Sequence, residues 1–403
     1  MNQTGPLDDI MRSVAVPPKN GQWMPLATML RRHSLKVDLV AEQERVWIKV
    51  IARNTKAFRL DMAGMENNII DDDDDLNDFD DDNSDISDID ESSKAGIVNV
   101  EAPSFDELPI FKKARAYLTC AQAHSVHFKT PIVVFAFMRI HRDQDPFVQR
   151  IMDQLEHMGI CIYLQDQQDI RSTYMPVMKQ VFGVGQLPKL DAMYALTTPK
   201  LNLDVSTVLA MVSELSHHVC GVDQVEGEAL QLQAAQEMTE PIIPQLERIL
   251  HGKQLFMTQS AFDRLESIMA VVAGPMEKQR YHYLFPSTSN DNNKSNPHVW
   301  TSLTPPSPIT VIPDQPTTRF TQLLEPPKGG MISKLNNGRK IRSRFSSFHA
   351  IIFGTADHHQ MTTITAIQWM PTALAEAGLL GSAIITHPPR SLAEQKMHTS
   401  NDS

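Results

Sequence analysis

Three observations predict an α/β protein of about two domains. The chain has 403 residues, which is more than an average single hydrophobic core accommodates. In the N-terminal half, short apolar runs typical of strands alternate with amphipathic runs typical of helices. In the C-terminal half, the order of strand, turn and helix occurs twice. Because strands joined by helices pair in parallel, we expect the N-terminal half to form a small domain with a mostly parallel sheet, covered on both faces.

The N-terminal α/β domain is expected over residues 1–65 and 94–185, followed by a linker at 186–199. Its apolar pattern predicts the following elements in chain order: a helix and a strand within 24–43, a strand at 46–52, a helix at 105–123, a strand at 131–137, a helix at 146–158, a strand at 160–164, and a loop from 165 to 199. The glycine-rich fragment at 182–186 lacks the residues that a phosphate-binding loop needs, so it is interpreted as a turn.

A strongly acidic segment at 66–93 interrupts this domain. It contains fourteen acidic residues and no Lys or Arg, so the rest of the chain carries about +3 although the net charge is −11. Such a composition predicts a disordered insert. Three roles remain open beyond a solvated loop: phosphorylation at Ser87, which has acidic residues just downstream; competition for a basic groove of the same chain; and binding of a basic protein partner.

The first strand of the C-terminal half is predicted to end at Asp204. Leu201 and Leu203 alternate with polar residues, and Asp204 precedes an amphipathic run typical of a helix. A lone Asp at such a turn is usually a helix cap. It also lies at the strand end where open α/β sheets bind ligands.

A second aspartate, Asp357, has the same setting. The run at 350–353 is typical of a strand, Gly354 and Thr355 break it, and a helix is expected from Asp357 to Gln368. Pro371 suits the start of another helix, and Gly378 suits its end. The run at 382–388 is typical of a further strand. Two carboxylates at neighbouring strand ends would attract a hard divalent cation, so Asp204 and Asp357 are the candidate catalytic and metal-binding residues.

Residues 200–397 resemble a PIN-like nuclease domain, with LNLDVSTVL as its first strand and first metal-binding Asp and IFGTAD as its later Thr-x-Asp segment. The whole chain is similar to an uncharacterised eukaryotic family that carries an unknown-function label and pairs an α/β N-terminal region with a PIN-like domain. The resemblance implies a three-layer α/β domain that holds Mg²⁺ or Mn²⁺ and hydrolyses phosphodiesters, with RNA as the expected substrate. The alternative is a catalytically degenerate PIN-like module that binds RNA or a protein partner.

The resemblance also implies a third acid on the helix after the second strand, and this sequence departs from it. The register places Arg264 at that position, with Asp263 and Glu266 beside it. Neighbouring helix positions point about 100 degrees apart, so neither acid simply replaces it. Glu237 and Glu240 are further candidate ligands, although a solvated helix face is the favoured explanation for all four acids. An acid near both aspartates would favour the nuclease, and Arg264 in that space would favour the degenerate module.

A basic cluster lies shortly before the second aspartate. Arg339, Lys340, Arg342 and Arg344 fall within six positions, a density that suits phosphate binding, although a solvated basic loop is the alternative. It follows two segments, 286–308 and 325–338, whose Pro, Gly, Ser and Asn content predicts flexible inserts without core residues.

Composition limits the cellular setting. The three cysteines have no zinc-type spacing and are odd in number, which favours a reducing compartment. The N-terminal residues lack the pattern of a signal peptide, and no stretch is long and apolar enough for a membrane span. A cytoplasmic or nuclear protein without membrane contact is therefore expected.

Overall fold

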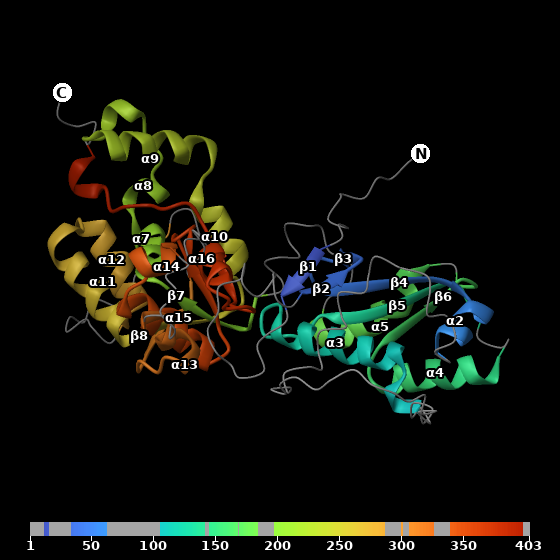
Figure 1. Cartoon of the computed structure of the whole chain (residues 1–403). Helices are drawn as coiled ribbons and strands as arrows, with labels where there is room; N and C mark the ends of the chain where they lie inside the picture. The colour runs from blue at the N-terminus through green and yellow to red at the C-terminus, as the bar shows by residue number, and fades with distance from the viewer. Residues whose placement is uncertain are drawn as a thin grey trace, which may run out of the picture. The chain divides into compact units, whose positions relative to one another are not determined.

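The chain folds into two compact units, seen here in a computed structural model (Figure 1). The structure describes residues 12–15, 34–62, 105–141, 145–167, 169–183, 197–286, 300, 306–325 and 339–397. One unit comprises 1–20, 28–124 and 130–183, and the other 21–27, 125–129 and 184–403. The acidic insert at 66–93, with Ser87, lies outside the described residues. None of the described helices is long and apolar enough to cross a membrane.

The N-terminal unit is built on a four-stranded sheet in the order β3-β4-β5-β6. The strands are β3 (Leu39–Ala41), β4 (Val46–Asn54), β5 (Ile132–Arg139) and β6 (Cys161–Leu164). β4, β5 and β6 are parallel, and β3 joins β4 antiparallel. A separate antiparallel pair is formed by β1 (Arg12–Ala15) and β2 (Ser34–Val37). The predicted α/β class with a mostly parallel sheet is confirmed.

The helices of this unit are α2 (Thr55–Met62), α3 (Pro109–Ala123) after a short turn of 3-10 helix at Phe105–Glu107, α4 (Pro146–His157) and α5 (Ile170–Phe182). The predicted loop from 165 to 199 is wrong over α5. Asp169 caps this helix by accepting a 2.9 Å hydrogen bond from the Arg171 amide. Gly183 ends it with φ at 72°, a left-handed conformation that glycine adopts without strain. The fragment interpreted as a turn is therefore a helix end.

The C-terminal unit has a five-stranded sheet in the order β11-β10-β7-β8-β9, with every neighbouring pair parallel. The strands are β7 (Lys200–Leu203), β8 (Gln254–Thr258), β9 (Ile309–Ile312), β10 (Thr362–Thr365) and β11 (Ile384–Thr386). The chain runs from the central β7 out to β9, then returns to place β10 on the other side of β7. The order of strands therefore reverses between β7 and β10, and such a reversal is where ligands bind in open α/β sheets.

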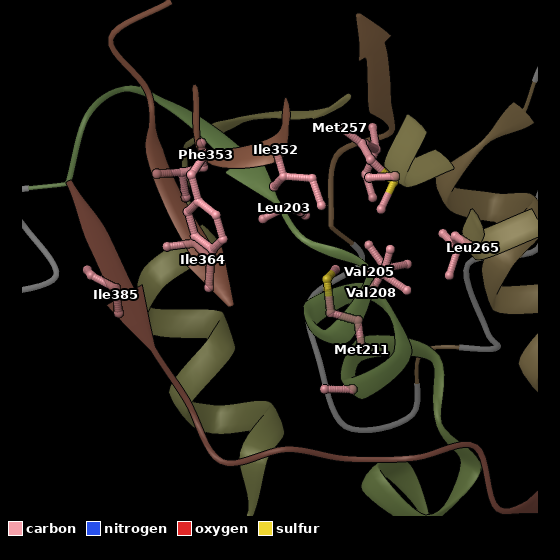
Figure 2. Packing of buried hydrophobic residues seen from close by; sticks show 14 of the residues in the cluster. Leu203, Val205, Val208, Met211, Met257, Leu265, Ile352, Phe353, Ile364 and Ile385 are labelled. Carbon is pink, nitrogen blue, oxygen red and sulfur yellow. The ribbon is translucent and has the colours of Figure 1, made fainter. Parts of the chain in front are cut away.

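Helices cover both faces of this sheet. They are α7 (Val205–Val212), α8 (Glu214–His217), α9 (Glu228–Thr239), α10 (Ile242–Leu250), α11 (Gln259–Val272), α12 (Pro275–Leu284), α13 (Thr318–Thr321), α14 (Arg339–Arg344), α15 (Ser347–His358) and α16 (Met370–Glu376), with short turns of 3-10 helix at Val222–Gln224, Gln322–Leu324 and Glu394–Lys396. In Figure 2, Leu203 of β7 lies between Ile352 of α15 on one side and Val208 and Met211 of α7 on the other. One hydrophobic core thus joins the layers.

Trp300 corrects the expectation that the segment 286–308 holds no core residues. Its side chain is 5% exposed and belongs to the hydrophobic core of the unit. The ring contacts His217 at 5.5 Å and Tyr283 at 5.8 Å between ring centroids. Residues 287–299, 301–305 and 326–338 lie outside the described part.

The strand predicted over 350–353 is wrong, because these residues lie inside α15. The apolar run is buried against the core on a helix, an ambiguity that short apolar runs carry. Gly354 does not break the chain there. A Cβ atom at Gly354 would lie 2.9 Å from Cβ of Pro316 and 3.0 Å from Cβ of Phe320, so glycine lets α13 pack closely on α15. The helix expected from Asp357 to Gln368 is also wrong, because α15 ends at His358 and β10 then occupies Thr362–Thr365.

Candidate functional site at the carboxyl edge of the C-terminal sheet

Asp204 lies where it was predicted, immediately after β7, and it caps α7. Its Oδ1 accepts a 2.7 Å hydrogen bond from the amide of Val205. The residue is 3% exposed, so its carboxylate depends on protein donors rather than on water. A buried carboxylate at a helix N-terminus is also favoured by the helix dipole.

Two hydroxyl groups complete the environment of this carboxylate. Ser206 Oγ and Thr365 Oγ1 each donate a 2.8 Å hydrogen bond to Asp204 Oδ2. The same two hydroxyls accept from backbone amides: Ser206 from Ala366 at 2.9 Å, and Thr365 from Ile367 at 3.1 Å. Asp204 therefore ties the end of β7 to the end of β10, at the point where the strand order reverses.

The neighbouring strand end contributes His387, which the sequence pattern did not single out. Its Nε2 lies 2.9 Å from Thr207 Oγ1, whose hydroxyl is also 2.8 Å from the carbonyl oxygen of Ile364. Its Nδ1 lies 2.8 Å from the carbonyl oxygen of Pro388. Burial lowers the pKa of His387, partly offset by its contact with Pro388 and by Asp204. The only sequence signal was its place near the end of a predicted strand.

Asp357 does not join Asp204. It lies in the last turn of α15, just before β10 begins, whereas Asp204 follows the end of β7. Because β7 and β10 are parallel, the two aspartates belong to opposite edges of the sheet. Asp357 lines a small cavity together with Ser382, Ala383 and Ile384, the residues that lead into β11. The predicted pair of carboxylates is not formed.

Asp357 has a structural partner instead. The Arg319 guanidinium pairs with both carboxylate oxygens and donates from Nε to Oδ2 at 2.7 Å. Thr317 Oγ1 donates to the same oxygen at 2.7 Å, and Arg319 Nη1 donates to the Leu380 carbonyl oxygen at 3.1 Å. This cluster fastens α13 to the end of α15 and to the segment before β11.

Arg264 lies on α11, at the sequence position where the resemblance expected the third acid. Its guanidinium lies over the ring of Phe348, 4.8 Å from the ring centroid. Burial lowers the pKa of His349; Asp204 opposes this shift and Arg264 adds to it. The charges of Asp204 and Arg264 therefore both act on the ring of His349. The residue that α11 contributes to this group is a cation, Arg264, and not an acid.

The other candidate acids have positions that explain them without a metal. Asp263 is exposed and accepts a 2.7 Å hydrogen bond from Gln259 Nε2. Glu266 is also exposed. Burial raises the pKa of Tyr281 to about 12, and the negative charge of Glu266 acts in the same direction. Glu240 is exposed after α9, and its carbonyl oxygen accepts from Arg390 Nη2 at 3.0 Å. None of these acids is placed beside Asp204 by a shared contact.

Glu237 is fully buried and pairs with the fully buried guanidinium of Arg390. The carboxylate also accepts a 3.0 Å hydrogen bond from the Ile242 amide. In the part of the chain that the structure describes, no group of three or more His, Cys, Asp or Glu side chains could hold a metal ion. The donors near Asp204 thus do not fit the Mg²⁺ or Mn²⁺ centre that the aspartates were predicted to form, because two metal ions need several carboxylates.

The basic cluster forms α14, directly before α15. α14 contacts α16, the helix that follows β10. Arg344 is exposed, whereas the side chains of Arg339, Lys340 and Arg342 lie outside the described part of the structure. The cluster is therefore a helix rather than the basic loop that was the alternative.

Comparison with known proteins gives one family match. A family model described as "Protein of unknown function (DUF1308)" matches residues 201–304, which include most of β7 together with Asp204, β8 and Arg264. The expected similarity to a family with an unknown-function label is confirmed for these residues, and the PIN-like assignment stays a prediction. No solved structure matches the chain.

Proposed function

We propose that the C-terminal unit is a PIN-like domain that binds single-stranded RNA and does not cleave it through a metal centre. The observation that carries this proposal is Arg264, a cation that lies over Phe348 in the neighbourhood of Asp204. A cation there attracts the phosphates of a nucleic acid, whereas an acid there would have helped to bind a divalent cation.

The fold supports the PIN-like part of the proposal. A parallel sheet lies between helical layers, and Asp204 follows its central strand, as the resemblance requires.

The Thr-x-Asp pattern is absent from the strand end where it would face Asp204. β10 is followed by Ala366 and Ile367, so an isoleucine stands third in the Thr365-Ala366-Ile367 segment. The Thr-Ala-Asp segment that gave the resemblance lies on α15, near the opposite edge.

The chemistry of Asp204 supports the non-catalytic part. Three protein donors already satisfy its carboxylate, and the residue is 3% exposed. Binding a cation would require this hydrogen-bonded network to open, with no second carboxylate among its hydrogen-bond partners to compensate. Asp204 is thus assigned a structural role, the joining of β7 to β10.

Fluorescence anisotropy with a labelled 12-nucleotide RNA at low salt, followed by gel analysis of the same RNA after incubation with Mg²⁺ or Mn²⁺, tests this function. We expect saturable binding that weakens with added salt, and intact RNA after incubation. Cleavage that disappears in Asp204→Asn would overturn the proposal in favour of a nuclease. Absence of binding by the full chain would overturn it in favour of a module with a protein partner.

A further inference from the structure

A half-exposed group of ring side chains lies beside Arg264. His349 is the centre of this group, and its ring centroid is 5.7 Å from that of Phe345, 5.7 Å from that of Trp369 and 6.5 Å from that of Phe348. Phe345 is buried, whereas Phe348, His349 and Trp369 are partly exposed. We call Phe348, His349 and Trp369 the aromatic cluster. Large aromatic rings that remain partly exposed next to one another often mark a binding surface.

Two helices, α15 and α16, bring the aromatic cluster together at the carboxyl edge of the sheet. Phe348 and His349 lie in the first turn of α15, and Trp369 caps the start of α16 shortly after β10 ends. The Ser346 amide donates a 3.1 Å hydrogen bond to His349 Nδ1, which holds the ring at the helix N-terminus. Side chains fixed in this way lose little conformational entropy when they bind a ligand.

Positive charge borders the aromatic cluster. Arg264 lies over Phe348, and the exposed Arg344 is next in sequence to Phe345. Helix α14, which ends at Arg344, contacts α16, the helix that begins directly after Trp369. Asp204 is buried and hydrogen-bonded below, so it does not present a charge at the surface.

We infer that the aromatic cluster stacks with an unpaired base of single-stranded RNA, while Arg264 and Arg344 hold the adjoining phosphates. This inference rests on the proposed function and specifies how that site takes its ligand. Aromatic rings combined with cations are the arrangement by which proteins bind single strands, because every base offers a flat π face. A duplex buries those faces in its own stack, so a single strand fits better.

The experiment compares two ligands of equal charge and length: a 12-nucleotide single-stranded RNA and the same backbone with abasic positions. The full-length protein should bind the RNA about 5- to 150-fold more tightly than the abasic strand, since one stacked base contributes in that range. Trp369→Leu and His349→Leu place an aliphatic side chain at each position and remove the stacking ring, and each should reduce this preference at least about five-fold.

Arg264→Gln separates the cation from the rings. It should weaken binding of both strands and lower the salt dependence, because one phosphate contact is lost. Arg248→Gln is the matched control, since Arg248 is exposed on α10, which leads to the amino end of β8; it should change neither affinity by more than about two-fold.

The outcomes distinguish the two proposals. Equal affinity for RNA and abasic strand, unchanged in the Leu variants, would overturn the stacking inference while RNA binding stands. No binding of either strand would overturn both proposals. Circular dichroism melting identifies a variant that fails to fold. In that case, tryptophan fluorescence of the unmodified protein is measured with RNA and with the abasic strand, and Phe348→Leu serves as the comparison. Quenching by RNA but not by the abasic strand supports stacking. Quenching by neither strand contradicts it.

Discussion

Thr365 donates a 2.8 Å hydrogen bond to Asp204, and this single bond joins the ends of two strands that are 161 residues apart in the chain. Both residues are buried. The bond therefore helps to hold Asp204 at the strand end, and it can be removed by one conservative substitution.

Thr365→Val should lower the free energy of unfolding by about 1–3 kcal/mol, because it leaves a buried carboxylate oxygen with one donor fewer. Urea denaturation measures this change. Thr310→Val is the control, since Thr310 is exposed on β9, and it should change stability by less than about 0.5 kcal/mol. Equal effects of the two substitutions would show that the bond to Asp204 contributes nothing.

Gly354→Ala should destabilise the protein by about 1–3 kcal/mol, because the new methyl group would collide with Pro316 and Phe320. Helix propensity alone predicts the opposite sign, a gain of up to about 1 kcal/mol. Thermal melting decides between the two. Ser347→Ala, at an exposed position of the same helix, should change stability little. A stabilised Gly354→Ala protein would mean that α13 does not pack on α15 as described.

Glu237→Gln should cost about 3–5 kcal/mol of stability, because it leaves the buried guanidinium of Arg390 without its counter-charge. Glu240→Gln, three positions along and exposed, is the matched control and should be close to neutral. Chemical denaturation of both variants gives the comparison. If the two variants proved equally stable, Glu237 would not be the buried partner of Arg390.

His217 should make the folded protein less stable as the pH falls. Burial lowers its pKa to about 4, with the charge of Arg280 acting in the same direction. The unfolded chain, whose histidines titrate near pH 6.5, therefore binds a proton before the folded protein does. The contribution of neutral His217 is full above about pH 6.5 and is lost progressively down to about pH 4. An NMR titration of its ring protons in the folded protein checks this, and a midpoint near 6.5 would contradict it.

Deletion of the acidic segment 66–92 should tighten RNA binding at low salt and have little effect at high salt. The fourteen acids of this segment can compete with RNA phosphates for the cations of α14, and added salt screens that competition. Anisotropy titrations of full-length and deleted protein at two salt concentrations test this. Arg339→Ala with Arg342→Ala should remove the gain. If the binding curves of full-length and deleted protein superimpose at low salt, the acidic segment does not compete with RNA.

Local patterns were sufficient wherever one element decides its own structure. The alternating run before Asp204 and the apolar run at 132–139 became β7 and β5, and Pro146 begins a helix as its chemistry requires. The apolar run at 350–353 was assigned wrongly. Strand and buried helix share this composition, and the close contact of Gly354 with Pro316 depends on a partner 38 residues away.

By itself, the sequence determined the α/β class, the place of Asp204 at a strand end, and the presence of Arg264 where the resemblance expected an acid. Each of these depends on residues that are near one another in the chain. The tertiary structure decided that Asp357 pairs with Arg319 and that Asp204 is bound by hydroxyls of Ser206 and Thr365. Whether two distant carboxylates meet depends on which end of each strand they follow, and that is fixed only when the parallel strands pair into one sheet.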